Sequence, residues 1–154
     1  MNFADTNWLC AMFFDLTEEG RTATVRRFMR QHRGPLGISH VVYLEARNVF
    51  SRNAGEAQPP EWEEFQAGLN GRFYLDPMNW DLLRREVFAL VERYSHKATL
   101  GTFDLAVFAS AKLAGASSFL SFDETVKAVA SADGMEVFPP LNAEGQRLLA
   151  KLRA

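Results

Sequence analysis

The sequence contains very little cysteine, and this scarcity narrows the chemistry available to the protein. The single cysteine, Cys10, lies between Trp8 and Met12 in an apolar stretch, so it can form no internal disulfide and is expected to be a buried thiol. No cysteines and histidines stand at zinc-binding spacing. The sequence also has neither a charged leader with an apolar core nor an apolar run that could span a membrane. We therefore expect a cytoplasmic protein.

An excess of charge of one sign is also missing, because the formal net charge of the 154 residues is −2. An anionic polymer could therefore be bound only through a local basic patch. Hydrophobic residues make up 47% of the sequence and include 13 phenylalanines, a composition typical of a packed protein rather than a disordered chain. The length suits one domain, so residues 1–154 are expected to form a single domain.

Short apolar segments alternate with helical patterns along the chain. The segments predicted as strands are 2–4, 36–38, 118–122 and 135–138. Helical patterns separate them, which favours a parallel sheet with right-handed crossovers. Two helices that begin at Pro60 and Asp76 are expected to form an antiparallel hairpin beside the sheet. The predicted fold is α/β, a three-layer α/β/α arrangement with a short, mostly parallel central sheet of about four strands and a helical hairpin.

Two aspartates directly follow predicted strands. Asp5 comes after strand 2–4 and Asp123 comes after strand 118–122. The carboxyl ends of parallel strands share one edge of a sheet, where ligands bind. The helix after Asp5 has its apolar positions at Trp8, Leu9, Met12, Phe13 and Leu16. Asp5 therefore has a second interpretation as the N-cap of that helix.

Two further acids lie on the apolar stripes of predicted helices. Asp104 is in the first turn of a helix that Thr102 can cap, and Glu45 lies on the apolar stripe of an earlier helix. Burying an unpaired carboxylate costs free energy, so each must be paired, hydrogen-bonded or bound to metal. A salt bridge with Arg47 or Arg52 is the alternative for Glu45.

These four acids are expected at one rim of a small sheet, and none of their motifs contains lysine or arginine. At about 4 Å and an effective dielectric constant near 20, each like-charged pair costs roughly 4 kcal/mol, so the cluster needs a cation. Ligation by oxygen alone favours Mg²⁺ or Mn²⁺ over zinc. A metal ion held by carboxylates, with positions left open for water and phosphate oxygens, suits phosphodiester hydrolysis.

A basic stripe is predicted on the helix over residues 22–33. Arg26, Arg30 and Arg33 recur there at i, i+4 and i+7. Such a stripe can contact the phosphates of a nucleic acid, but it can equally be a solvated helix face.

Three segments carry a resemblance to a known family. They are DTN at residues 5–7, SHVVYLEARNVF at 39–50 and TFDLAVFASAKLAGASSFLSFDETVKAVASADGMEVFPP at 102–140. With these segments the sequence resembles the PIN-domain ribonucleases, and within them the VapC-like toxins of type II toxin–antitoxin systems. The resemblance spans essentially the whole chain, and HKATLGTFDLAVFASA is its most specific part.

The resemblance implies roles for individual residues. It implies that metal is bound by Asp5, Asp104 and Asp123. Glu45 would bind the metal directly or through water, or would help to deprotonate the attacking water. Asn7 and Ser121 would orient the carboxylates.

The resemblance also implies partners, namely a single-stranded or loop RNA as substrate, a small antitoxin that blocks the acidic pocket, and a second copy of the chain in a homodimer. This sequence departs from the family at Val107, where relatives commonly have a histidine three residues after the third acid, so an auxiliary RNA contact is in doubt. The first strand is also unusually short.

Two other functions fit parts of the pattern. A PIN-like fold could serve as a catalytically silent protein-binding module, although four intact acids argue against this. A phosphate-receiving signalling domain also gathers acids around Mg²⁺, but it needs a lysine after a late strand, where this chain has Asp123 and Glu124. The four acids predict hydrolysis dependent on Mg²⁺ or Mn²⁺, and the resemblance implies that the protein is an endoribonuclease, the toxin of a toxin–antitoxin pair.

Overall fold

The structure, a computed structural model, describes residues 1–15 and 20–154. The described residues form one parallel sheet of five strands, each three residues long. The strands are β1 (Asn2–Ala4), β2 (Leu36–Ile38), β3 (Phe73–Leu75), β4 (Ser118–Leu120) and β5 (Glu136–Phe138). Their order across the sheet is β3-β2-β1-β4-β5, so β1 lies at the centre. The carboxyl ends of all five strands therefore lie along one edge.

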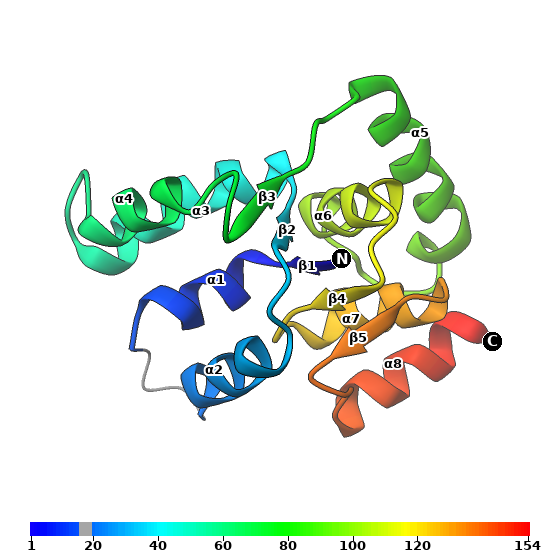
Figure 1. Ribbon diagram of the computed structural model, residues 1–154. Helices are drawn as coiled ribbons and strands as arrows, with labels where there is room; N and C mark the ends of the chain where they lie inside the picture. The colour runs from blue at the N-terminus through cyan, green and yellow to red at the C-terminus, as the bar shows by residue number, and fades with distance from the viewer. Residues whose placement is uncertain (16–19) are drawn as a thin grey trace.

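Eight α-helices among the described residues cover the sheet. They are α1 (Thr6–Phe13), α2 (Arg21–Gln31), α3 (His40–Ala54), α4 (Pro60–Ala67), α5 (Trp80–Leu90), α6 (Thr102–Leu113), α7 (Glu124–Ala132) and α8 (Ala143–Arg153). A π-helical turn over Val91–Ser95 extends α5. In Figure 1, α1 to α4 lie on the left, α5 and α6 at the upper right, and α7 and α8 alongside β4 and β5. The helices thus flank a central sheet, and the three-layer α/β/α arrangement is confirmed. In the described part of the chain, no helix is both long and apolar enough to cross a membrane.

Strand β3 was not expected from the sequence, and it changes the arrangement of the helices. Phe73, Tyr74 and Leu75 pair in parallel with β2, and they separate α4 from α5 in the chain. Helix α4 packs against α3, whereas α5 packs against α6 (Figure 1). The expected hairpin between the helices at Pro60 and Asp76 is therefore corrected to a pair formed by α5 and α6. Helix α5 begins later than expected, because the Asn79 side chain caps it by accepting from the Leu82 N–H at 3.1 Å.

Close packing brings the central strands β1 and β2 together at Phe3 and Gly37. A Cβ atom at Gly37 on β2 would clash with the Phe3 ring on β1, so only glycine allows this approach. Trp8, in the helix that follows, is fully buried and stacks on Phe122 with ring centroids 5.5 Å apart. These contacts hold the β1–α1 junction against the segment that follows β4. Leu16, expected on the apolar face of the same helix, lies outside the described residues.

Candidate functional site

A cavity of about 280 Å³ lies at the carboxyl-end edge of the sheet. All four acids singled out in the sequence line it. Asp5 comes from the β1–α1 junction, Glu45 from α3, Asp104 from the first turn of α6 and Asp123 from the β4–α7 junction. The structure therefore brings together four carboxylates from widely separated parts of the chain. We call this cavity the acidic cavity.

The two junction aspartates cap helices and line the cavity at the same time. One oxygen of Asp5 accepts from the Thr6 N–H at 2.8 Å, and one oxygen of Asp123 accepts from the Thr125 and Val126 N–H groups at 2.8 and 3.2 Å. The N-cap interpretation of Asp5 and its position on the rim are thus both correct. Asp104 has no such cap bond. Gly101 is the N-cap of α6, and Thr102, expected to cap it, is already the first helical residue.

Hydrogen bonds from Ser121 and Asn7 hold these carboxylates in place. The fully buried Ser121 hydroxyl donates to Asp5 Oδ2 at 2.8 Å and accepts from the Asp123 N–H at 3.0 Å. Asn7 donates to Ser121 Oγ at 3.2 Å and accepts from the Phe122 N–H at 2.9 Å. Asp5 and Asp123 are therefore joined through one serine, so the end of β1 cannot move independently of the end of β4.

Burial and mutual repulsion in the acidic cavity oppose the simultaneous ionisation of its four carboxyl groups. Asp5 is only 5% exposed, and burial raises its pKa to about 7 despite hydrogen bonds from Ser121 and Thr6. The charges of Glu45 and Asp104 raise this pKa further. The pKa of Asp104 is also raised, first by burial and then by the charges of Asp123 and Glu45. The four carboxylates are thus close enough to repel one another.

Two arginines also line the acidic cavity: Arg52 on α3, already considered as a partner of Glu45, and Arg21 at the start of α2, which the sequence did not single out. The Arg21 guanidinium lies over the Phe122 ring at 5.0 Å. No periodic pattern in the sequence marks Arg21, because this residue reaches the acidic cavity only through the tertiary approach of α2 to the β4–α7 junction. Arg47, one proposed partner of Glu45, instead donates to Ser51 Oγ and to the Ala57 carbonyl at 2.6 and 2.8 Å.

The single thiol also lies at this cavity. Cys10 is 5% exposed, and burial raises its pKa to about 12. A thiol with so high a pKa is a poor nucleophile at neutral pH. The expectation of a buried cysteine is confirmed.

The acidic residues fit a hard divalent cation by charge and donor type. Over residues 1–15 and 20–154, no three side chains of His, Cys, Asp or Glu approach closely enough to form a ready-made metal site. The cavity nevertheless presents four carboxylates, and oxygen donors are those that Mg²⁺ and Mn²⁺ prefer. A doubly charged ion would offset the repulsion that raises the pKa of Asp5 and Asp104.

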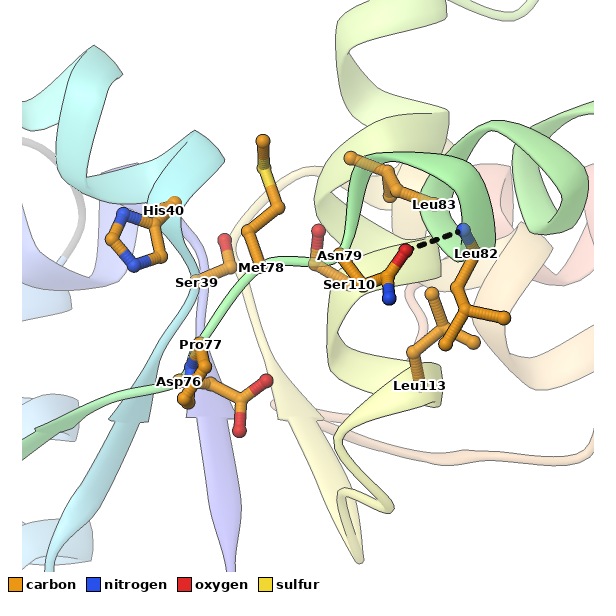
Figure 2. A pocket seen from close by; sticks show the side chains of 10 residues that line it. All are labelled: Ser39, His40, Asp76, Pro77, Met78, Asn79, Leu82, Leu83, Ser110 and Leu113. Atoms are coloured by element: carbon orange, nitrogen blue, oxygen red, sulfur yellow. Dashed lines mark hydrogen bonds between the residues drawn. The ribbon is translucent and has the colours of Figure 1, made fainter.

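A smaller cavity of about 100 Å³ lies further along the same edge of the sheet. Figure 2 shows Ser39 and Asp76, which follow β2 and β3, facing it together with Ser110. Leucine side chains from α5 and α6 line the other side (Figure 2). It shares no lining residue with the acidic cavity and contains a single carboxylate, Asp76. One carboxylate among apolar side chains is a weaker cation site than four, so the acidic cavity is the candidate site.

Comparison with known proteins agrees with this geometry. Residues 3–132 match the family model described as PIN domain. No curated protein sequence matches the chain significantly. The solved structure of Mycobacterium tuberculosis VapC20, a toxin that cleaves the sarcin–ricin loop, is 18% identical with a TM-score of 0.65, and the match covers 88% of this chain and 96% of that one. FitAcB from Neisseria gonorrhoeae is 16% identical with a TM-score of 0.57, with 91% and 98% covered. At these identities the two structures show a shared fold.

Proposed function

Because this chain belongs to the PIN domain family, we propose that it is a metal-dependent endoribonuclease that hydrolyses RNA phosphodiester bonds, and that it is the toxin of a toxin–antitoxin pair. The observation that carries the proposal is the convergence of four carboxylates in one cavity at the carboxyl-end edge of the sheet. The likeness to VapC20, a toxin that cleaves the sarcin–ricin loop, supports RNA as the substrate.

Each residue has a distinct role in this proposal. Asp5, Asp104 and Asp123 would hold a Mg²⁺ or Mn²⁺ ion. The ion, when bound, supplies positive charge that offsets the negative charge developing on the phosphate oxygens during hydrolysis. Glu45, which lines the same cavity, would accept the proton of the attacking water. The Ser121 hydroxyl fixes the orientation of Asp5 through its 2.8 Å bond.

The arginines of the cavity suit an anionic substrate. Arg21 and Arg52 line the acidic cavity together with the four acids, so the cavity is not uniformly negative. Guanidinium groups bind phosphate oxygens through paired N–H donors. A phosphodiester can therefore approach the carboxylates without meeting only like charges.

Cleavage assays with purified protein test this function. Labelled single-stranded and hairpin RNAs are incubated with Mg²⁺, with Mn²⁺ or with EDTA, and products are separated by size. We expect internal cleavage with either metal, none in EDTA, and none with Asp104→Asn. Asp81→Asn, which changes an exposed carboxylate on α5, is the matched control and keeps activity. Cleavage that persists in EDTA, or that survives Asp104→Asn, contradicts the proposal.

A protein-binding role is the second candidate, and an apolar cavity of about 750 Å³ between α3 and the start of α5 and α6 favours it. Trp80 is 64% exposed there, and Leu44 and Phe103 are exposed beside it. Apolar surface of this kind marks protein contacts. It suits the small antitoxin or the second copy of the chain that the proposed function includes. If RNA is never cleaved but this surface binds a protein partner, the silent binding module is the correct function.

A further inference from the structure

A separate cavity of about 650 Å³ gathers basic side chains from two different parts of the chain. We call this cavity the basic hollow. Its basic residues are Arg26, Arg30, His32, Arg33 and Arg72. Three of them are the arginines of the stripe on α2 and after its end, and Arg72 joins them from the residue before β3. No acidic residue lines this cavity in the described part of the chain.

The basic hollow lies at the opposite edge of the sheet from the acidic cavity. Gly34 and Pro35, which also line it, lead into β2, and Gly71 with Arg72 leads into β3. Because β2 and β3 are parallel, both of their amino ends lie at the same edge. The acids instead follow the carboxyl ends of strands. The two cavities are therefore separated by at least the length of a three-residue strand, about 10 Å.

Among the described residues, the guanidinium groups of the hollow lack strong acidic partners, although Arg72 lies over the Phe73 ring at 5.2 Å. Within residues 1–15 and 20–154, Arg26, Arg30 and Arg33 have no acidic partner, and all three are exposed. Arg72 reaches Glu64 only at 3.9 Å, and both side chains are more than half exposed, so this ion pair contributes little. Clustered, unpaired arginines repel one another, and an anion with several charges would relieve that repulsion.

The ring of His32 is held in place beside these arginines, with its Nδ1 bonded to the backbone of its own helix. It stacks on Phe28 with centroids 4.0 Å apart, and its Nδ1 lies 3.0 Å from the Phe28 carbonyl oxygen. Along α2, Arg26 and Arg30 are separated by about 6 Å of helix rise, so they would contact different charges of an extended anion. A single small anion would engage only part of the hollow.

We propose that the basic hollow binds the phosphate backbone of the RNA at nucleotides remote from the cleaved bond. This inference rests on the proposed function, because that function places RNA on the opposite edge of the sheet. At about 3.4 Å per stacked nucleotide, at least about three nucleotides are needed to span the minimum of about 10 Å between the edges. An RNA shorter than this cannot occupy both sites. The hollow thus makes the protein select longer RNA without reading its sequence.

Binding measurements test the hollow directly. A labelled 30-nucleotide oligouridine is titrated against protein in the Asp104→Asn background, which prevents cleavage, at salt concentrations from 50 to 200 mM. Each arginine that contacts a phosphate of a single strand contributes about 0.7 to the slope of log K against log salt. We expect Arg30→Ala and Arg72→Ala each to lower that slope by about 0.7, so that their loss of affinity is about threefold greater at 50 mM than at 200 mM.

The chain offers a matched control for this experiment. Arg27 is exposed on the same helix but does not line the hollow, so Arg27→Ala is expected to keep the wild-type slope. Circular dichroism confirms that every variant is folded. Equal slopes in wild type, Arg27→Ala, Arg30→Ala and Arg72→Ala overturn the proposal.

Cleavage by the otherwise unmutated protein separates the hollow from the proposed activity. We expect Arg30→Ala to lower kcat/KM about threefold more for the 30-nucleotide RNA than for a dinucleotide substrate, mainly through KM. An equal loss on both substrates overturns the hollow while leaving the nuclease intact. No cleavage of any RNA by wild type refutes the proposed function itself. If the variants lose affinity for poly-L-glutamate but not for RNA, the hollow belongs to an acidic polypeptide and the RNA proposal is wrong.

Discussion

Asp5 is a buried carboxylate whose ionisation should oppose folding whenever no cation is present. Burial raises its pKa from 3.8 to about 7 in the folded protein. Between these values the unfolded chain has lost the proton while the folded chain keeps it, so the free energy of unfolding falls as pH rises. The full shift of about 3 units corresponds to about 4 kcal/mol, and about 2.5 kcal/mol of this is lost between pH 5 and pH 8. Above pH 8 the loss levels off.

Asp5→Asn removes this titration and keeps the helix cap, because an Asn oxygen can still accept from the Thr6 N–H. In EDTA, the stability of the variant relative to wild type is therefore expected to rise by about 2.5 kcal/mol from pH 5 to pH 8. For a domain of this size, that is a relative shift in Tm of about 5–10 °C. The measurement is thermal and urea unfolding, followed by circular dichroism at pH 5, 6, 7 and 8.

Asp15→Asn, which removes one exposed carboxylate outside the acidic cavity, is measured in parallel as the control for the loss of a charge. Addition of Mg²⁺ at pH 8 should raise the Tm of wild type more than that of Asp5→Asn, by mass action on the folded state. A difference between wild type and Asp5→Asn that stays constant from pH 5 to pH 8 would refute the reasoning, because Asp5 would then ionise as an ordinary exposed acid.

Three further predictions follow from individual features of the structure. Ser121→Ala removes the hydrogen bonds to Asp5 Oδ2 and from the Asp123 N–H, so urea unfolding should show a loss of about 1–3 kcal/mol in the free energy of unfolding. The same variant should cleave RNA with a lower kcat, whereas the salt slope of its RNA binding should be unchanged. Gly37→Ala should cost about 1–3 kcal/mol in urea unfolding through its clash with the Phe3 ring, whereas Gly34→Ala, whose Cβ meets nothing within 4 Å, should cost far less. Light scattering should give twice the chain mass of 17.4 kDa if the apolar cavity binds a second copy, and a monomer mass contradicts the homodimer.

The positions of Asp5 and Asp123 could be predicted from the sequence because each follows an apolar strand, although β4 ends at Leu120, two residues before the end of the predicted strand 118–122. Parallel strands then place their carboxyl ends together, whatever the details of the helices. Glu45 and Asp104 could be predicted because a carboxylate on an apolar helix stripe is unusual. In each case the signal is local, and the topology rule supplies the convergence.

The parts that the sequence did not reveal depend on tertiary contacts or on very short patterns. Strand β3 has three residues, and only Phe73 among them is buried, so no alternation could be recognised. Arg21 reaches the acidic cavity through the packing of α2, and Arg72 reaches the basic hollow because β3 lies beside β2. Thr102 was predicted as the cap of α6, but the helix already begins at Thr102 and Gly101 is its N-cap, so the predicted boundary was wrong by one residue.

The bond between Ser121 and Asp5 joins residues 116 positions apart in the chain. During synthesis, Asp5 emerges from the ribosome long before its partner, and 118 further residues must be added before Asp123 exists. At about 5–20 residues per second, this interval lasts roughly 6–24 s. Throughout that time the growing chain carries Asp5 without the serine that orients it and without the strand that pairs beside β1. The acidic cavity is therefore completed only when about four-fifths of the protein has been made, and a nascent chain shorter than this lacks the assembled set of four carboxylates.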